Sequence, residues 1–196
     1  LSPGSDVEVL GEDRYVIHSG VTVFVESYLQ GVWKACEKKG AELKIQKIVS
    51  LEELESFDAI VLCVGAGIRH FPECGHLRIN FVKGQALICE HVQTVSVVAK
   101  QYIALTEVPG ICHLGATYER DFISEEADLE AAVKLLKPKY PVIGCRAGIR
   151  VTNPAHYFPI LEKINLKTWA ITALGSRGLL YHGYMGQLLT QALFPV

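Results

Sequence analysis

A turn bracketed by glycines near the C-terminus is the part of this sequence best suited to chemistry. The turn Gly175-Ser176-Arg177-Gly178 follows the apolar run at 169–174 and precedes a predicted helix at 180–193. Such a turn brings several backbone N–H groups and the positive end of a helix dipole to one point. We therefore expect the turn to bind anionic or electron-rich atoms of a ligand.

Two arginines are candidates for binding a carboxylate. Arg150 ends the mainly apolar segment Cys145-Arg-Ala-Gly-Ile-Arg150, which is predicted to be a strand, and Arg177 lies in the turn. A planar guanidinium can donate two parallel hydrogen bonds to a carboxylate. The partner of Arg150 could be the carboxylate of a ligand or an Asp or Glu of the protein, and the sequence leaves both open.

The composition describes a globular protein that is large enough to bury a core. Of its 196 residues 49% are hydrophobic and 20% charged, and a net charge of −2 gives no argument for binding nucleic acid or membranes. No apolar run is long enough to span a membrane. The six cysteines form no CxxC pair, which predicts free thiols in a reducing cytoplasm and no metal site.

Hydrophobic periodicity predicts an α/β layer in the first third of the chain. Apolar spacing and the stop at Gly40 predict a helix within residues 21–39. Strands are predicted at 14–18, 41–48 and 57–64, and a short helical turn at 51–54.

The middle of the chain changes to consecutive strands, predicted at 78–90, 94–98, 102–105 and 111–118. These strands predict a mainly antiparallel sheet over residues 77–120. A connecting segment at 121–141 contains a helix predicted to begin at Ser124 and to end near Pro138. A strand at 142–151 and the elements after it return to α/β character. The predicted fold class is therefore α/β with an α+β subdomain, in which 14–70 and 142–196 pack together.

Four segments, taken in chain order, resemble the D-amino-acid-oxidase-like family of FAD-dependent oxidoreductases. Residues 58–67 resemble the family's D-x-V-V-x-A-x-G-A strand and turn, and Lys83-Gly84-Gln85 resembles its Arg-Gly-Gln. Residues 113–119 resemble its I-G-A-S/T-Y strand, and residues 145–150 its A-G-x-R strand. The turn at 175–178 is similar to the one that closes the family's flavin site.

The resemblance implies an FAD cofactor and oxidation of a C–N bond in an amino acid or secondary amine that carries a carboxylate. It implies substrate contacts from Arg150, Tyr118 and Arg177, although Tyr118 could equally be a half-buried aromatic of the sheet. The cofactor contacts that it implies are Gly65, Ala66, Gly67, Gly175, Ser176, Arg177, Gly178 and Leu179. No catalytic acid or base is assigned, because a flavin itself accepts the hydride.

The sequence departs from the family pattern at several points. Lysine replaces arginine at position 83, and Pro159-Ile-Leu-Glu lacks the glycine of the family's P-x-x-G. No G-x-G-x-x-G turn is present, since Gly65-Ala-Gly67 is followed by Ile68-Arg-His70. The only methionine is Met185. We therefore expect a C-terminal fragment that lacks the N-terminal FAD-binding segment.

One branch of the family looks most similar. The pair Gly115-Ala-Thr-Tyr118 and Leu174-Gly-Ser-Arg-Gly-Leu179 resembles the FAD domain of bifunctional enzymes that finish 5-methylaminomethyl-2-thiouridine in tRNA. The expected substrate is then a small-molecule amine or an amine carried by tRNA. Two other interpretations remain: a small-molecule-binding module without redox chemistry, and a degenerate structural domain.

Overall fold

The computed structural model describes residues 6–11, 14–91 and 94–195 of the chain. The strands are β1 (Val7–Gly11), β2 (Arg14–Ile17), β3 (Ile60–Leu62), β4 (Asn80–Glu90), β5 (Val97–Val98), β6 (Tyr102–Leu105), β7 (Ile111–Gly115), β8 (Val142–Thr152), β9 (Ile160–Lys163) and β10 (Thr168–Thr172). The α-helices are α1 (Val25–Glu37), α2 (Leu129–Leu136) and α3 (Gly178–Leu193), and the 3₁₀ turns are η1 (Leu51–Leu54), η2 (Gly65–His70) and η3 (Pro72–Cys74).

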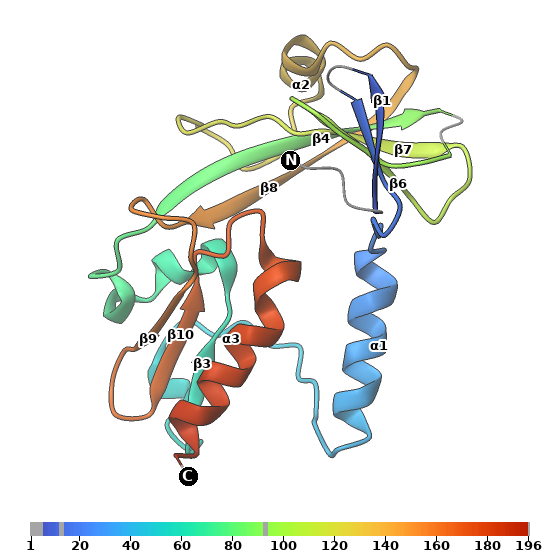
Figure 1. The fold of residues 1–196 in the computed structure, drawn as a ribbon. Coiled ribbons are helices and arrows are strands. Elements are labelled where there is room, and N and C mark those ends of the chain that lie inside the picture. Colours follow the sequence, from blue (N-terminus) through green and yellow to red (C-terminus); the bar gives the residue numbers. More distant parts are fainter. Residues whose placement is uncertain (1–5, 12–13, 92–93, 196) are drawn as a thin grey trace.

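An antiparallel five-stranded sheet in the order β5-β6-β7-β4-β8 is the centre of the fold. Its two long strands β4 and β8 pair from Asn80 opposite Thr152 to Cys89 opposite Val142, and they cross the upper part of Figure 1. Alternation along β4 sends Leu87 toward α2, where it is fully buried. It packs there in a core made by Leu87, Cys89, Cys112, Leu114, Ala132 and Leu136.

A smaller mixed sheet has the order β3-β10-β9, with β10 parallel to β3 and antiparallel to β9. Its core is made by Leu51, Ile60, Leu62, Ile68, Phe71, Cys74, Leu77 and Ala170. Figure 1 shows this sheet below the five-stranded sheet, with α3 beside it. The end of β10 leads into the turn before α3, which places that turn near the large sheet.

The helices α1 and α3 are tied to each other by one side-chain contact. The Tyr28 hydroxyl and Nε2 of His182 lie 2.6 Å apart, and the two rings meet edge to face. Within the described parts of the chain no α1 residue is buried, although its apolar spacing predicted the helix correctly. None of the helices described here is long and apolar enough to cross a membrane.

The predicted fold class is confirmed, and most predicted elements are present with shifted ends. The predicted strand at 41–48 is wrong, because residues 41–50 form no regular element and Ile45 is 92% exposed. A strand needs a hydrogen-bonded neighbour, and no strand of the described residues runs beside this segment. The strands β1 and β9 were not predicted. The division into domains remains a prediction, although strand pairing places β8 in the five-stranded sheet.

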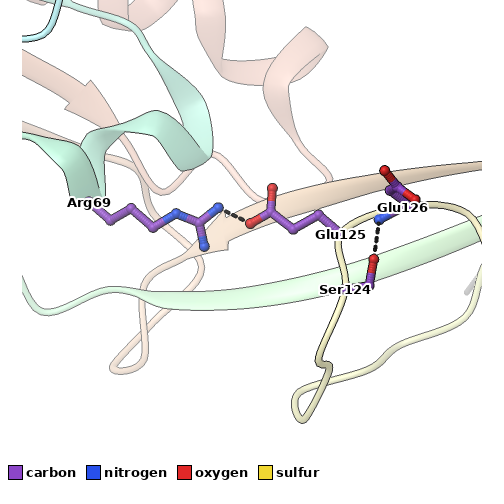
Figure 2. A network of polar contacts seen from close by, with 4 residues as sticks. All are labelled: Arg69, Ser124, Glu125 and Glu126. Carbon is purple, nitrogen blue, oxygen red and sulfur yellow. Dashed lines mark hydrogen bonds and ion pairs between the residues drawn. The ribbon is translucent and has the colours of Figure 1, made fainter.

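The predicted helix start at Ser124 is wrong, because α2 begins at Leu129. Asp128 is the cap, and its carboxylate accepts a 2.9 Å hydrogen bond from the Ala131 N–H. Figure 2 shows the contacts of the residues before the helix: Glu125 pairs with Arg69, while the Ser124 hydroxyl accepts the Glu126 N–H. Residues 124–126 thus make loop contacts, and the helix begins after the Asp128 cap.

Candidate functional site

The open face of the five-stranded sheet, opposite α2, forms the floor of a cavity of about 810 Å³, which we call the sheet cavity. Residues 22–26, at the start of α1, lie along its rim. Its lining includes Glu26, Tyr102, His113, Arg146 and Arg150. The cavity therefore combines an apolar floor with a few groups that can bind charge, as in many small-molecule sites.

Arg150 lies across this floor above Gly84. A Cβ atom added to Gly84 would lie 2.6 Å from Cζ of Arg150, so only glycine leaves room for the guanidinium in this position. Nη2 donates one long hydrogen bond, 3.4 Å, to the Thr117 carbonyl. Within the described parts of the chain Arg150 makes no ion pair with a carboxylate. This half-buried cation therefore keeps most of its donors available.

Tyr102 was missed by the sequence analysis. It pairs with Gly115 across β6 and β7, and a Cβ atom on Gly115 would lie 2.7 Å from its hydroxyl oxygen. Gly115 in turn pairs with Ala86 on β4. The Tyr102 ring and the Arg150 guanidinium thus approach β4 from opposite sides, each over a glycine. Only the strand register reveals this arrangement, because a tyrosine in a strand gives no signal by itself.

His113 and Arg146 lie further along the same face. Burial, together with the nearby charge of Arg146, lowers the pKa of His113 from its ordinary value of 6.5, while Glu26 acts in the opposite direction. The imidazole is therefore neutral at pH 7. Arg146 faces Glu26 across a loose ion pair of 3.8 Å in which both side chains are mostly exposed.

The two flanking residues of Lys83-Gly84-Gln85 point away from the sheet cavity. Lys83 is 4% exposed and Gln85 fully buried, and neither lines the cavity. The side-chain oxygen Oε1 of Gln85 accepts the Asp128 N–H at 2.6 Å, and its side-chain Nε2 donates to the Glu119 carboxylate at 3.1 Å. The replacement of arginine by lysine at position 83 therefore does not change the cavity surface, and Gln85 holds α2 and the 117–119 segment against the sheet.

A second hollow of about 410 Å³, the turn cavity, lies where β8 meets the turn before α3. The Gly175 N–H donates a 2.9 Å hydrogen bond to the Val151 carbonyl, next to Arg150. Tyr118, Arg150 and Arg177 all line this cavity, so the structure brings the three predicted substrate residues together. Tyr118 is 59% exposed, and Arg177 stacks over the Tyr157 ring at 4.4 Å.

The turn itself provides free backbone donors. Gly175 has a φ of +57°, a conformation that favours glycine. The Arg177 N–H donates to the Leu174 carbonyl at 2.9 Å. The N–H groups of Ser176, Gly178 and Leu179 have no partner in the part of the chain that the structure describes. These donors at the start of α3 fit an anionic or electron-rich group.

Gly65, Ala66 and Gly67 lie apart from both cavities. They begin η2, where Gly65 has a φ of +52°, and none of them lines either hollow. Arg69 of η2 pairs with Glu125 (Figure 2). Its guanidinium also lies 5.2 Å from the centre of the Phe81 ring on β4. The structure thus ties this segment to the large sheet, while its contact with a cofactor stays a prediction.

The fold defined by these sheets is similar to that of several solved oxidases and dehydrogenases. Glycine oxidase from Geobacillus kaustophilus matches with a TM-score of 0.54 and 19% identity, over 68% of this chain and 40% of its own. Iminodiacetate oxidase from Chelativorans sp. BNC1 matches with a TM-score of 0.54 and 21% identity, over 70% and 42%. L-proline dehydrogenase from P. horikoshii matches with a TM-score of 0.53 and 14% identity, over 69% and 41%.

The chain belongs to the DAO family of FAD-dependent oxidoreductases, whose family model matches residues 3–192. The resemblance seen in the sequence is thereby confirmed at the level of the family, and the FAD cofactor that it implied is confirmed as the cofactor of that family. No curated protein matches the chain. The chain spans about 40% of the length of the solved structures that it matches.

Substitution of Gly84 by alanine is expected to preserve the fold and to weaken carboxylate binding about fivefold, because the new methyl group displaces the Arg150 guanidinium. The clash is with the end of a flexible side chain, which can move at low cost. Isothermal titration with N-methylglycine measures the effect. Gly31→Ala in α1 is the control, since a Cβ there meets nothing within 4 Å and Gly31 lines neither cavity. Equal losses in the two variants would contradict this role of Gly84.

Proposed function

We propose that this chain provides the substrate side of an FAD-dependent oxidoreductase that oxidises a C–N bond in an amino acid or secondary amine carrying a carboxylate. The observation that supports this most directly is Arg150, a half-buried guanidinium over Gly84 with no carboxylate partner among the described residues. A cation held this way is suited to a carboxylate of a ligand. Arg150 lines both the sheet cavity and the turn cavity.

The residues divide into two groups by their chemistry. Arg150 anchors the carboxylate, and the Tyr102 hydroxyl adds a donor from the opposite side of β4. The turn from Gly175 to Leu179 would hold the flavin, through the backbone N–H groups of Ser176, Gly178 and Leu179 that have no partner among the described residues. When bound, FAD accepts the hydride from the amine carbon. Tyr118 and Arg177 border the substrate at the turn cavity.

The substrate class follows from the anchor and from what the relatives are called. Solved structures with this fold include a glycine oxidase and an iminodiacetate oxidase, both named for small amines with carboxylates. A carboxymethylated amine on a tRNA wobble uridine is a larger member of the same class, favoured by the residues at 115–118 and 174–179. The net charge of −2 gives this chain little attraction for tRNA, so the small-molecule amine is our first proposal.

Anaerobic titration of the whole gene product that carries this sequence tests the proposal. Flavin absorbance that bleaches when N-methylglycine, glycine or a carboxymethylaminomethyl nucleoside is added would support it, and the responding compound would identify the class. Saturable ligand binding without bleaching would favour the non-redox binding module. A protein with neither flavin nor ligand binding would favour the degenerate structural domain.

We expect the 196-residue chain alone to release FAD during gel filtration. The sequence has no G-x-G-x-x-G turn to hold the pyrophosphate of FAD. Without such an anion site, dinucleotide binding is expected to weaken by several kcal/mol, about the sum of two or three charge-assisted hydrogen bonds. The ratio of flavin absorbance, at roughly 450 nm, to protein absorbance, at roughly 280 nm, measures how much FAD the chain retains. Stoichiometric flavin in the protein peak would contradict this expectation.

A further inference from the structure

We propose that the sheet cavity contains a second anion-binding subsite, formed by Arg146 with His113, which selects amines that carry two carboxylates. The inference rests on the proposed function, because Arg150 supplies the first subsite. It adds a specificity-determining pair of residues that the resemblance to the family did not assign.

The two arginines lie on one face of one strand. Arg146 and Arg150 are both on β8 and both line the sheet cavity. Four residues of strand separate their Cα atoms by roughly 13 Å. The position between them on this face is Gly148, and Gly84 lies opposite it on β4, so no side chain of these strands rises between the two cations.

The position of the Arg150 head group shortens this separation. Its guanidinium lies over Gly84, which pairs with Gly148, and it is therefore displaced one step along β8 toward Arg146. One two-residue step of strand, roughly 7 Å, then remains between the Arg150 head group and the strand position of Arg146. This span suits a short molecule with a carboxylate at each end and an amine in the middle.

Arg146 is available to a ligand because its present partner holds it weakly. Glu26, in the first turn of α1, stands 3.8 Å away, with the two side chains 63% and 81% exposed. An exposed pair at this distance contributes little, so a better-placed carboxylate can replace Glu26. The other acidic side chain of the lining, Glu107, accepts a hydrogen bond from the Ser27 hydroxyl.

His113 completes the subsite with a neutral donor. It pairs with Ile88, one step along β4 from Ala86, and Ala86 pairs with Arg146. Both side chains line the sheet cavity, and burial, with a smaller effect of the Arg146 charge, lowers the pKa of His113. A neutral imidazole can donate one N–H to the carboxylate that Arg146 attracts. Ala86 places only a methyl group on β4 between them, and the neighbouring Ile88 lies against Gly144, where a Cβ atom would be 3.3 Å from its Cδ1.

Isothermal titration of the 196-residue chain with iminodiacetate and N-methylglycine tests the proposal, because the two probes differ by one carboxylate. We expect iminodiacetate to bind about tenfold more tightly, as one added charge-assisted pair would give. Arg146→Gln is expected to bring the ratio of the two affinities close to one. Glu26→Gln is expected to raise the ratio, because it removes the competing carboxylate. Arg78→Gln, an exposed arginine outside both cavities, controls for the change in net charge.

The outcomes separate this proposal from the function on which it rests. Equal affinities for the two probes in the unaltered chain, or an unchanged ratio in Arg146→Gln with circular dichroism showing a native fold, would overturn the second subsite alone. Affinities for both probes that are unaffected by Arg150→Lys would overturn the first subsite, and with it the proposed function. Absence of binding by either probe to the folded chain would count against both.

Discussion

Replacement of Arg150 by lysine is expected to lower kcat/KM for the amine about ten- to a hundredfold in the whole gene product, corresponding to roughly 1.5–3 kcal/mol. The guanidinium reaches over Gly84 with most of its donors available, and one ammonium cannot supply the same pair of parallel N–H groups. Steady-state kinetics, together with flavin occupancy from absorbance, measures the effect.

The control for this variant is Arg78→Lys, which makes the same chemical change at an exposed position outside both cavities. Its kinetics and flavin content should match those of the unaltered protein. Full flavin occupancy with unchanged kinetics in Arg150→Lys would mean that Arg150 has only a structural role. Loss of flavin in that variant would instead indicate that Arg150 acts through the turn at Gly175.

Leu87→Ala is expected to lower the free energy of unfolding by about 2–5 kcal/mol. Leu87 is fully buried on β4, between β7 and β8, and it packs under α2 with Cys112, Leu114 and Ala132. Removal of three carbon atoms there leaves a cavity that a sheet hydrogen-bonded on both sides cannot close. Urea denaturation followed by circular dichroism measures the loss.

Leu166→Ala provides the matched comparison, because it makes the same chemical change at a leucine that is 94% exposed. Its unfolding midpoint should stay within experimental error of the unaltered chain. Similar losses for the two variants would mean that the core beneath α2 contributes no more to stability than the surface does.

The sequence predicted the elements whose evidence is local. The apolar strands β4 and β8, the helix period of α1 and the glycine turn before α3 are all visible in short windows of residues, and the structure contains each of them. The segment at 41–48 has the same kind of local signal but no neighbouring strand. Pairing is a property of the whole fold, and a window of eight residues does not contain it.

The candidate site was likewise predictable only in part, because some of its residues are brought together by strand pairing and not by local sequence. Arg150 and Arg177 stand out as charges within apolar or glycine-rich surroundings, and the structure places them around one cavity. Tyr102 becomes a candidate only when the register puts it opposite Gly115. Arg146 lines the sheet cavity because it lies on the face of β8 that points away from α2. The sequence of one strand does not show which of its two faces packs against a helix.

The hydrogen bond from the Gly175 N–H to the Val151 carbonyl joins the turn directly to the strand that carries Arg150. The residues at 153–157 border the turn cavity but are not needed for this connection. Insertions or deletions in that loop can therefore reshape the rim of the turn cavity without moving Arg150 relative to the turn. The rim and the spacing between Arg150 and the turn are thus separate parts of the fold, so that the ligands admitted at the rim can change while that spacing is kept.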